Sequence, residues 1–277
     1  MKHLTLRSLL LVLVTAIAAS MCHAQTADTT GRGSGQVFAD ETMTYEGKIS
    51  KLKISWTVAD LTFSSVLQPD AKRLLITGEA TSRGTLVKLF RYSFLQRYDT
   101  LVDIEDFRVL KTTTHDVQKQ RVRDGEATFD HQAKRVTYVE TDPKSPTRPP
   151  RRIASEITPD MLDMTTAIYA ARLMPLEVGM RGELSVSDSG LVYKVPFTVT
   201  KRETQSTIFG KVSCLRVEPD IFGPGKLIEQ KGKMVIWFTD DARRIPVRGE
   251  VSTEYGKGIA RLKTYQKGTS ITPAKPS

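Results

Sequence analysis

The chain has 277 residues, of which 39% are hydrophobic and 26% are charged, and its formal net charge is +10. These proportions exclude a chain that is disordered throughout, because they leave enough apolar surface for a sizeable core. The length allows one large domain or two small ones.

Residues 1–24 have the pattern of a secretory signal peptide. Lys2 and Arg7 precede an apolar run, and Cys22 and Ala24 place small residues before a cleavage site at Gln25. The run is too short for a good spanning helix and no stop-transfer pattern follows it. We therefore expect a periplasmic protein with no transmembrane span in its mature chain. Lipidation at Cys22 is a less favoured alternative, because Met21 is bulky where a small residue is required.

Export affects which partners the basic net charge suggests. In a cytosolic protein it would suggest nucleic acid, whereas an exported protein meets anionic membrane surfaces, lipopolysaccharide and acidic glycans. A solvated basic surface without a partner is the favoured alternative. After cleavage Cys214 is the remaining cysteine, so no intramolecular disulfide is expected, and a buried, inert thiol is favoured over a nucleophile. His115 and His131 have no triad or metal-site spacing, so neither a metal nor a cofactor is predicted.

The first half of the chain predicts antiparallel strands. Residues 25–40 are small and polar, which favours a flexible lead-in. Three strands are expected by Thr81, then a short helix over 84–94, then more strands to residue 140. Within the latter, 118–123 is expected to be a polar strand and Asp124-Gly125 a tight turn.

A proline-rich basic segment divides the chain. Residues 143–152, PKSPTRPPRR, contain four prolines and must form an exposed connection. They carry the densest basic surface, which either contacts a phosphate-bearing surface or, as we favour, is a solvated loop. This surface consists of Lys144, Arg148, Arg151 and Arg152.

One helix is expected after this segment. Thr158-Pro159-Asp160 supplies an N-cap hydroxyl, a proline in the first turn and an acidic side chain near the positive helix end. Met161, Met164 and Ile168 then share one face. This helix would plug the concave face of a curved sheet or line an adaptable pocket, since methionine repacks around irregular ligands.

Residues 231–248 predict a β-hairpin around which the chain is organised. Its turn and second strand form a structural motif that comprises Thr239, Asp240, Asp241, Arg243, Arg244 and Pro246. The first strand has no polar face, because Val235 and Trp237 point one way while Met234, Ile236 and Phe238 point the other. Both faces must therefore be covered by protein, a ligand or a partner. The candidate apolar pocket consists of Met234, Ile236, Trp237, Phe238, Met161, Met164 and Ile168.

The hairpin also carries a family resemblance. Gly232-x-Met234-x-Ile236-Trp237-x-Thr239-Asp240-Asp241-x-Arg243-Arg244-Ile245-Pro246-Val247-Arg248 resembles the signature of a bacterial exported family, domain of unknown function 3108. Ile168-Tyr169-x-x-Arg172-Leu173-x-Pro175-Leu176-x-Val178-Gly179 resembles its central helix, and the similarity extends from about Glu41 to Tyr265. The resemblance implies a secreted or periplasmic β-rich domain and brings no established activity or catalytic residues.

The expected fold is mainly β: a single domain over 41–265 with a disordered tail from residue 266. We expect a curved antiparallel sheet or incomplete β-barrel with one principal helix packed inside it or across its opening. Asp240-Asp241 is the best carboxylate pair, but capping of the turn explains it without catalysis, and no catalytic motif is present. The sequence thus favours a non-catalytic binding or carrier module for an apolar or amphipathic ligand, such as a lipid or envelope glycolipid. An envelope protein-interaction or assembly module is the alternative, and a hydrolase is less favoured.

Overall fold

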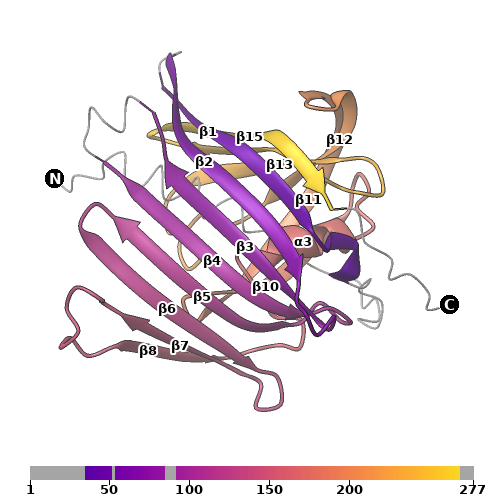
Figure 1. Cartoon of the computed structure of the whole chain (residues 1–277). Coiled ribbons are helices and arrows are strands. Elements are labelled where there is room, and N and C mark those ends of the chain that lie inside the picture. The colour runs from indigo at the N-terminus through magenta and orange to yellow at the C-terminus, as the bar shows by residue number, and fades with distance from the viewer. Residues whose placement is uncertain (1–34, 52–53, 85–91, 269–277) are drawn as a thin grey trace.

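The computed structural model describes residues 35–51, 54–84 and 92–268. The predicted signal peptide, the centre of the predicted 84–94 helix and the residues from 269 onward lie outside this part of the chain. The described strands form one continuous sheet that curls into an open barrel (Figure 1). The prediction of a mainly β, incomplete barrel with one principal helix is confirmed.

Almost every strand pairs with the strands that precede and follow it in sequence. The order across the sheet is β8-β7-β6-β5-β4-β3-β2-β1-β15-β14-β13-β12-β11-β10-β9, and only the β9–β10 pair is parallel. The strands are β1 (Glu41–Lys51), β2 (Ile54–Leu67), β3 (Arg73–Ser82), β4 (Phe94–Asp103), β5 (Val109–Gln118), β6 (Arg121–Asp130), β7 (Arg135–Thr141), β8 (Arg151–Glu156), β9 (Leu162–Asp163), β10 (Arg181–Asp188), β11 (Leu191–Thr207), β12 (Gly210–Pro219), β13 (Gly232–Thr239), β14 (Pro246–Thr253) and β15 (Gly256–Lys267).

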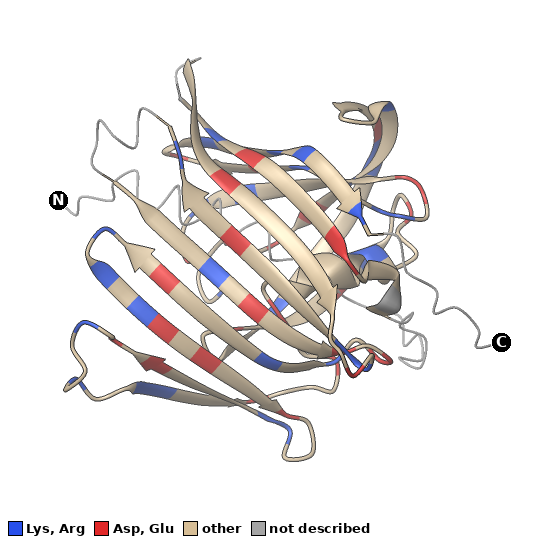
Figure 2. Ribbon diagram, in the orientation of Figure 1, with Lys and Arg blue, Asp and Glu red and all other residues tan. Residues whose placement is uncertain are grey.

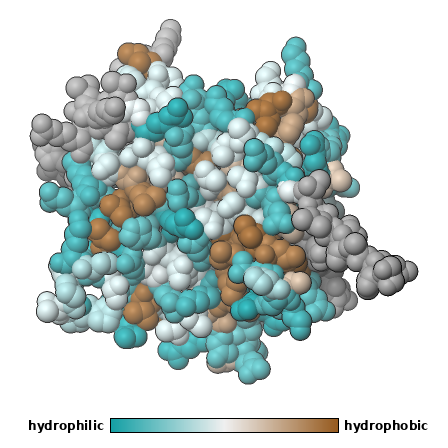
Figure 3. Space-filling view, in the orientation of Figure 1, coloured by the Kyte–Doolittle hydropathy of each residue, from teal (hydrophilic) through white to brown (hydrophobic). Residues whose placement is uncertain are grey.

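Alternating side chains explain why these segments form hairpins. In β3, Leu74, Ile76 and Ala80 are buried while the residues between them are more exposed, so one face of the strand meets the core. The pairing of β1 with β15 joins the first strand to the last. The polar outer face of β2–β6 carries both signs of charge intermixed, with scattered apolar groups (Figures 2 and 3).

The principal helix, α3 (Thr166–Leu173), lies inside the curled sheet, and its residues 166–172 are all buried. The predicted helix start at Thr158 is wrong: residues 159 and 160 form a turn, and Leu162 and Asp163 form β9. Asp163 takes the capping role, since its carboxylate accepts from the Thr166 backbone N–H at 2.7 Å. Consequently Met161 and Met164 precede the helix and do not share a helical face with Ile168.

The predictions for 118–125 are also wrong. The turn between β5 and β6 lies at residues 119–120, where Lys119 adopts a φ of +56°, so 118–123 is not one strand. Asp124 and Gly125 lie within β6. A Cβ atom at Gly125 would lie only 2.7 Å from Cε2 of Tyr138 on the neighbouring strand. Glycine at position 125 therefore leaves room for the Tyr138 ring to lie against the β6 backbone, and it does not form a turn.

Several boundaries differ from expectation by a few residues. A 3-10 helix (η2, Gly35–Phe38) precedes β1, and Phe38 packs edge-on against the Tyr169 ring at 5.1 Å between centroids. The proline-rich connection ends at Arg151, where the edge strand β8 begins. The last strand continues to Lys267. The predicted 231–248 hairpin is confirmed as β13 and β14.

Candidate functional site

Six of the seven residues predicted to line an apolar pocket meet in the interior. Met161, Met164 and Ile168 come from the segment that ends in α3, and Met234, Ile236 and Phe238 come from the inner face of β13; each is at most 4% exposed. They belong to one continuous core. Any ligand that reaches them must therefore displace packed side chains.

Trp237 is separated from that group. It lies on the other face of β13, where its indole N–H donates to the Glu203 carboxylate and the Arg248 guanidinium stacks 4.6 Å from its ring. The Arg216 guanidinium lies 5.9 Å from the same ring. Long side chains of neighbouring strands thus cover the second apolar face of β13. Amphipathic residues such as arginine commonly cover apolar surface in this way.

The turn after β13 has a structural role. The Asp241 carboxylate accepts from the Thr239 hydroxyl and the Arg243 backbone N–H, both at 2.9 Å, and pairs with the Arg243 guanidinium at 2.6 Å. Asp240 pairs with Arg202, and Arg244 donates to the Leu176 carbonyl at 3.4 Å. These contacts fix the turn and leave no carboxylate pair that faces a common space.

A buried ion pair connects α3 to this turn and to β1. Arg172 donates to both carboxylate oxygens of Glu41, with the Nη2–Oε1 distance at 2.7 Å, and also to the Arg243 carbonyl at 3.2 Å. The side chains are 3% and 1% exposed. Sequence reasoning missed this pair because its members are 131 residues apart. The pair orients the helix inside the sheet.

The two ends of the sheet approach each other without backbone pairing between β8 and β9. The Ser155 hydroxyl on β8 donates to the Gly190 carbonyl in the β10–β11 turn at 2.7 Å. From the opposite end of the sheet, Asp163 on β9 accepts from the hydroxyls of Thr100 on β4 and Thr112 on β5, the latter at 2.8 Å. Side-chain contacts therefore bridge this junction where the sheet stays open, and the lining there is polar.

We name the polar residues at this junction the seam cluster, which consists of Gln96, Tyr98, Tyr138, Asp188 and Tyr193. Electrostatic interactions connect Asp188 with the three tyrosines, and the Gln96 amide N–H donates to the Tyr98 hydroxyl at 3.2 Å. Asp188, Tyr98 and Tyr193 are half-buried, whereas Gln96 and Tyr138 are buried. The cluster thus extends from a partly exposed edge into the interior.

Two properties make the seam cluster suited to binding. Burial raises the pKa of Asp188 to about 6, and the nearby Asp163 carboxylate adds to the increase. The buried Oε1 atom of Gln96 has no hydrogen-bond partner, although such atoms are normally satisfied in native proteins. The cluster therefore offers hydrogen-bond acceptors that the described residues leave incompletely satisfied.

The predicted basic surface is largely paired. Lys144 donates to the Gln120 carbonyl at 2.8 Å, Arg148 lies 3.9 Å from Asp142, and Arg151 lies 3.8 Å from Glu140. Arg152 points to the opposite face of β8 from Arg151 and has no ion-pair partner among the described residues. The structure thus divides this surface into two ion-paired arginines, one lysine that donates to a backbone carbonyl, and one arginine without an ion-pair partner among the described residues.

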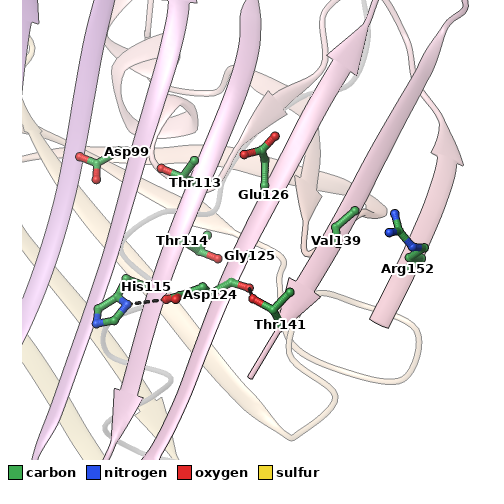
Figure 4. A pocket seen from close by; sticks show the side chains of 10 residues that line it. All are labelled: Asp99, Thr113, Thr114, His115, Asp124, Gly125, Glu126, Val139, Thr141 and Arg152. Carbon is green, nitrogen blue, oxygen red and sulfur yellow. Dashed lines mark hydrogen bonds and ion pairs between the residues drawn. The ribbon is translucent and has the colours of Figure 1, made fainter. Parts of the chain in front are cut away.

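Arg152 borders a shallow depression of about 580 Å³ on the outer face of β4–β8 (Figure 4). Across the depression, the His115 Nδ1 atom lies 2.5 Å from the Asp124 carboxylate. The lining is Asp99, Thr113, Thr114, His115, Asp124, Gly125, Glu126, Val139, Thr141 and Arg152. Sequence reasoning missed this depression because its residues come from five strands. They lie side by side only through the register of those strands, which the sequence does not show.

Other classes of site find little support in residues 35–51, 54–84 and 92–268. No helix there is long and apolar enough to cross a membrane, and no cluster of three or more potential ligands is arranged to hold a metal ion. Cys214 is buried and unpaired, and burial raises the pKa of its thiol to about 11, which suppresses the nucleophilic thiolate.

A family model described as "Protein of unknown function (DUF3108)" matches residues 40–263. The chain belongs to this family. The resemblance inferred from the hairpin is therefore confirmed, and DUF3108 membership carries no assigned activity. No curated protein matches the chain in sequence.

Among solved structures, the chain resembles a β-barrel-like protein of domain of unknown function DUF1849 from Brucella abortus. The TM-score is 0.51 at 9% identity, with 84% of this chain and 99% of that chain covered. A hypothetical protein from Chlamydia trachomatis gives a TM-score of 0.34 at 9% identity, with 88% and 98% covered. The Brucella protein supports the barrel-like fold of this DUF3108 chain.

Proposed function

We propose that this DUF3108 protein is a non-catalytic binding or carrier module of the bacterial cell envelope that holds an amphipathic ligand at the open side of its barrel. The observation that carries this proposal is the seam cluster. It places the unpartnered Gln96 carbonyl and the half-buried Asp188 beside an apolar core, at the one junction where the sheet does not close.

The chemistry of the cluster indicates how such a ligand would lie. Its acceptors favour a head group with hydroxyl or amide donors, and the rings of Tyr98 and Tyr193 supply partly exposed faces for contact. Met161 and Met164 flank Asp163, which itself interacts with Asp188. An apolar tail would enter along these methionines, whose unbranched side chains repack with little strain.

The cell-envelope location rests on the N-terminal sequence. The charged start, apolar run and small residues before Gln25 are the features of an exported precursor. A lipid or glycolipid with a hydroxyl-rich head group is the ligand class that suits both that location and the seam cluster.

Native mass spectrometry of protein purified from its own envelope, followed by organic extraction, tests the proposal. We expect a stoichiometric adduct of lipid mass that is reduced in Gln96→Met, which removes the amide acceptor, and in Asp188→Asn, which replaces one acceptor oxygen with a donor NH₂ group. Asp124→Asn, on the outer face of the same sheet, is the matched control and should retain the adduct. A wild-type protein that carries no such mass, and takes up none from envelope lipid extracts, would contradict the proposal.

An envelope protein-interaction module remains a second candidate because of β8. Among the described strands it pairs with β7 alone, so its other edge carries backbone groups that a partner strand can recruit. A photo-crosslinking residue at Ala154 of β8 should then capture one defined envelope protein, whereas the same residue at Thr264 on the central strand β15 should not. Equal labelling at both positions would reject this candidate.

A further inference from the structure

The outer depression is independent of the seam cluster because it faces away from the barrel interior. His115 and Asp124 occupy paired positions on β5 and β6, and Val139 and Arg152 occupy paired positions on β7 and β8. Figure 4 shows their side chains around one open hollow. Register thus assembles a surface that crosses five strands.

Two of the three acidic residues around the hollow have cationic partners. Asp99 pairs with Arg97 at 2.7 Å, and Glu126 pairs with Lys111 at 2.8 Å. The third, Asp124, contacts His115, which is a cation only when it is protonated. Arg152, in contrast, has no charged partner among the described residues. The positive charge available to an anionic ligand in this hollow is therefore the guanidinium of Arg152.

The remaining lining supplies hydroxyl groups and space. Thr113 and Thr141 can each donate and accept hydrogen bonds, whereas the Thr114 hydroxyl lies on the inner face of the sheet beside Gly125 and Tyr138. A volume of about 580 Å³ lies within the range of sites that bind small molecules. A ligand that satisfies this lining carries several hydroxyls together with one anionic group.

We propose that the outer depression is a binding site for a small hydroxyl-rich anion, an acidic sugar, with Arg152 as its anchor. The guanidinium fork matches the geometry of a carboxylate or phosphate and binds either through two parallel hydrogen bonds. The hydroxyls of Thr113 and Thr141 contact the sugar hydroxyls. Because the site is shallow and wet, binding depends on this single charge-assisted contact.

The test is an NMR titration of the isotope-labelled full mature chain with digalacturonate, glucose 6-phosphate and the neutral sugar maltose. We expect the amide signals of 113–115, 124–126 and 139–141 to shift with an anionic sugar and not with maltose. A response to digalacturonate alone identifies a uronate site, and a response to glucose 6-phosphate alone identifies a phosphate site.

Two variants of equal charge separate recognition from general attraction. Arg152→Gln should weaken binding about tenfold, the loss expected for one charge-assisted hydrogen-bonded contact, and Arg152→Lys should restore it only in part. Arg148→Gln removes a nearby cation outside the hollow and should leave binding unchanged. Equal weakening by Arg148→Gln and Arg152→Gln, equal shifts with maltose, or no shift with either anion would overturn the proposal. None of these outcomes bears on the lipid adduct expected at the seam cluster.

Discussion

At the scale of single residues, three interior carboxylates are stabilised in different ways. Glu41 is paired with Arg172. Asp163 is surrounded by hydroxyl and backbone N–H donors. Asp188 has no cation within ion-pair distance among the described residues, so burial raises its pKa to about 6. The first two carboxylates hold the fold together, whereas the third reduces stability at neutral pH.

We predict that Asp188→Asn stabilises the protein at pH 7.5. The folded protein retains a proton on Asp188 that the unfolded chain loses near pH 4, so this residue's contribution to stability decreases as pH rises from about 4 to 6. Asparagine removes that penalty, which is about 1–3 kcal/mol for a raised pKa of this size on a half-buried group. Urea unfolding at pH 4 and pH 7.5 measures the difference.

The control for Asp188→Asn is Glu105→Gln in the exposed β4–β5 turn, which should change neither stability nor its pH dependence. A loss of stability in Asp188→Asn at pH 7.5, or an unchanged difference between the two pH values, would contradict the prediction.

At the scale of elements, β6 shows how a neighbouring strand overrides a local turn signal. Asp124-Gly125 is a common turn dipeptide. Here it lies within a strand, because Gly125 faces Thr114 on one side and Tyr138 on the other. The β6 backbone is extended at the point where a larger side chain would collide with the Tyr138 ring.

We predict that Gly125→Ala destabilises the protein by about 1–3 kcal/mol, because the added methyl group overlaps the Tyr138 ring. The same substitution in a Tyr138→Val background should cost clearly less, since the smaller side chain leaves space for the methyl group. Urea unfolding of the four proteins of this double-mutant cycle measures the coupling. Strictly additive effects would show that the Tyr138 ring is not the obstacle.

At the scale of the whole molecule, the sheet has a strong centre and weak ends. β1 pairs along nearly its full length with both β2 and β15. β8 has one strand neighbour, and β9 contains only two residues. The protein is therefore most easily opened at the junction where the seam cluster lies.

We predict that hydrogen exchange begins at this junction. Backbone amides of β8 and of the β10–β11 turn should exchange well before those of β1 and β15, because strands with one neighbour open at lower free energy than central strands. Amide exchange followed by mass spectrometry at pH 7 measures the order. Uniform exchange across the sheet would mean that the junction is as stable as the centre.

Local side-chain patterns were sufficient to predict most of the strands and the 231–248 hairpin, and the hairpin motif was sufficient to indicate the family. Period-two alternation reports which face of a strand meets the core, and this information lies within a few residues. The same patterns placed Met234, Ile236 and Phe238 on one buried face of β13. The same patterns misplaced the start of the helix. Thr158 has the chemistry of an N-cap, but it is Asp163, held by the Thr112 hydroxyl, that accepts from the Thr166 backbone N–H at the start of α3.

Only the tertiary structure decided which distant residues meet. The Glu41–Arg172 pair, the seam cluster and the outer depression each combine side chains from separate strands, and no local pattern records strand register or the curl of a sheet. The sequence by itself determined a curved antiparallel sheet with one principal helix packed inside it or across its opening. The curl of that sheet brings the seam cluster together where the ends of the sheet approach, because its residues come from strands that are far apart in the sequence.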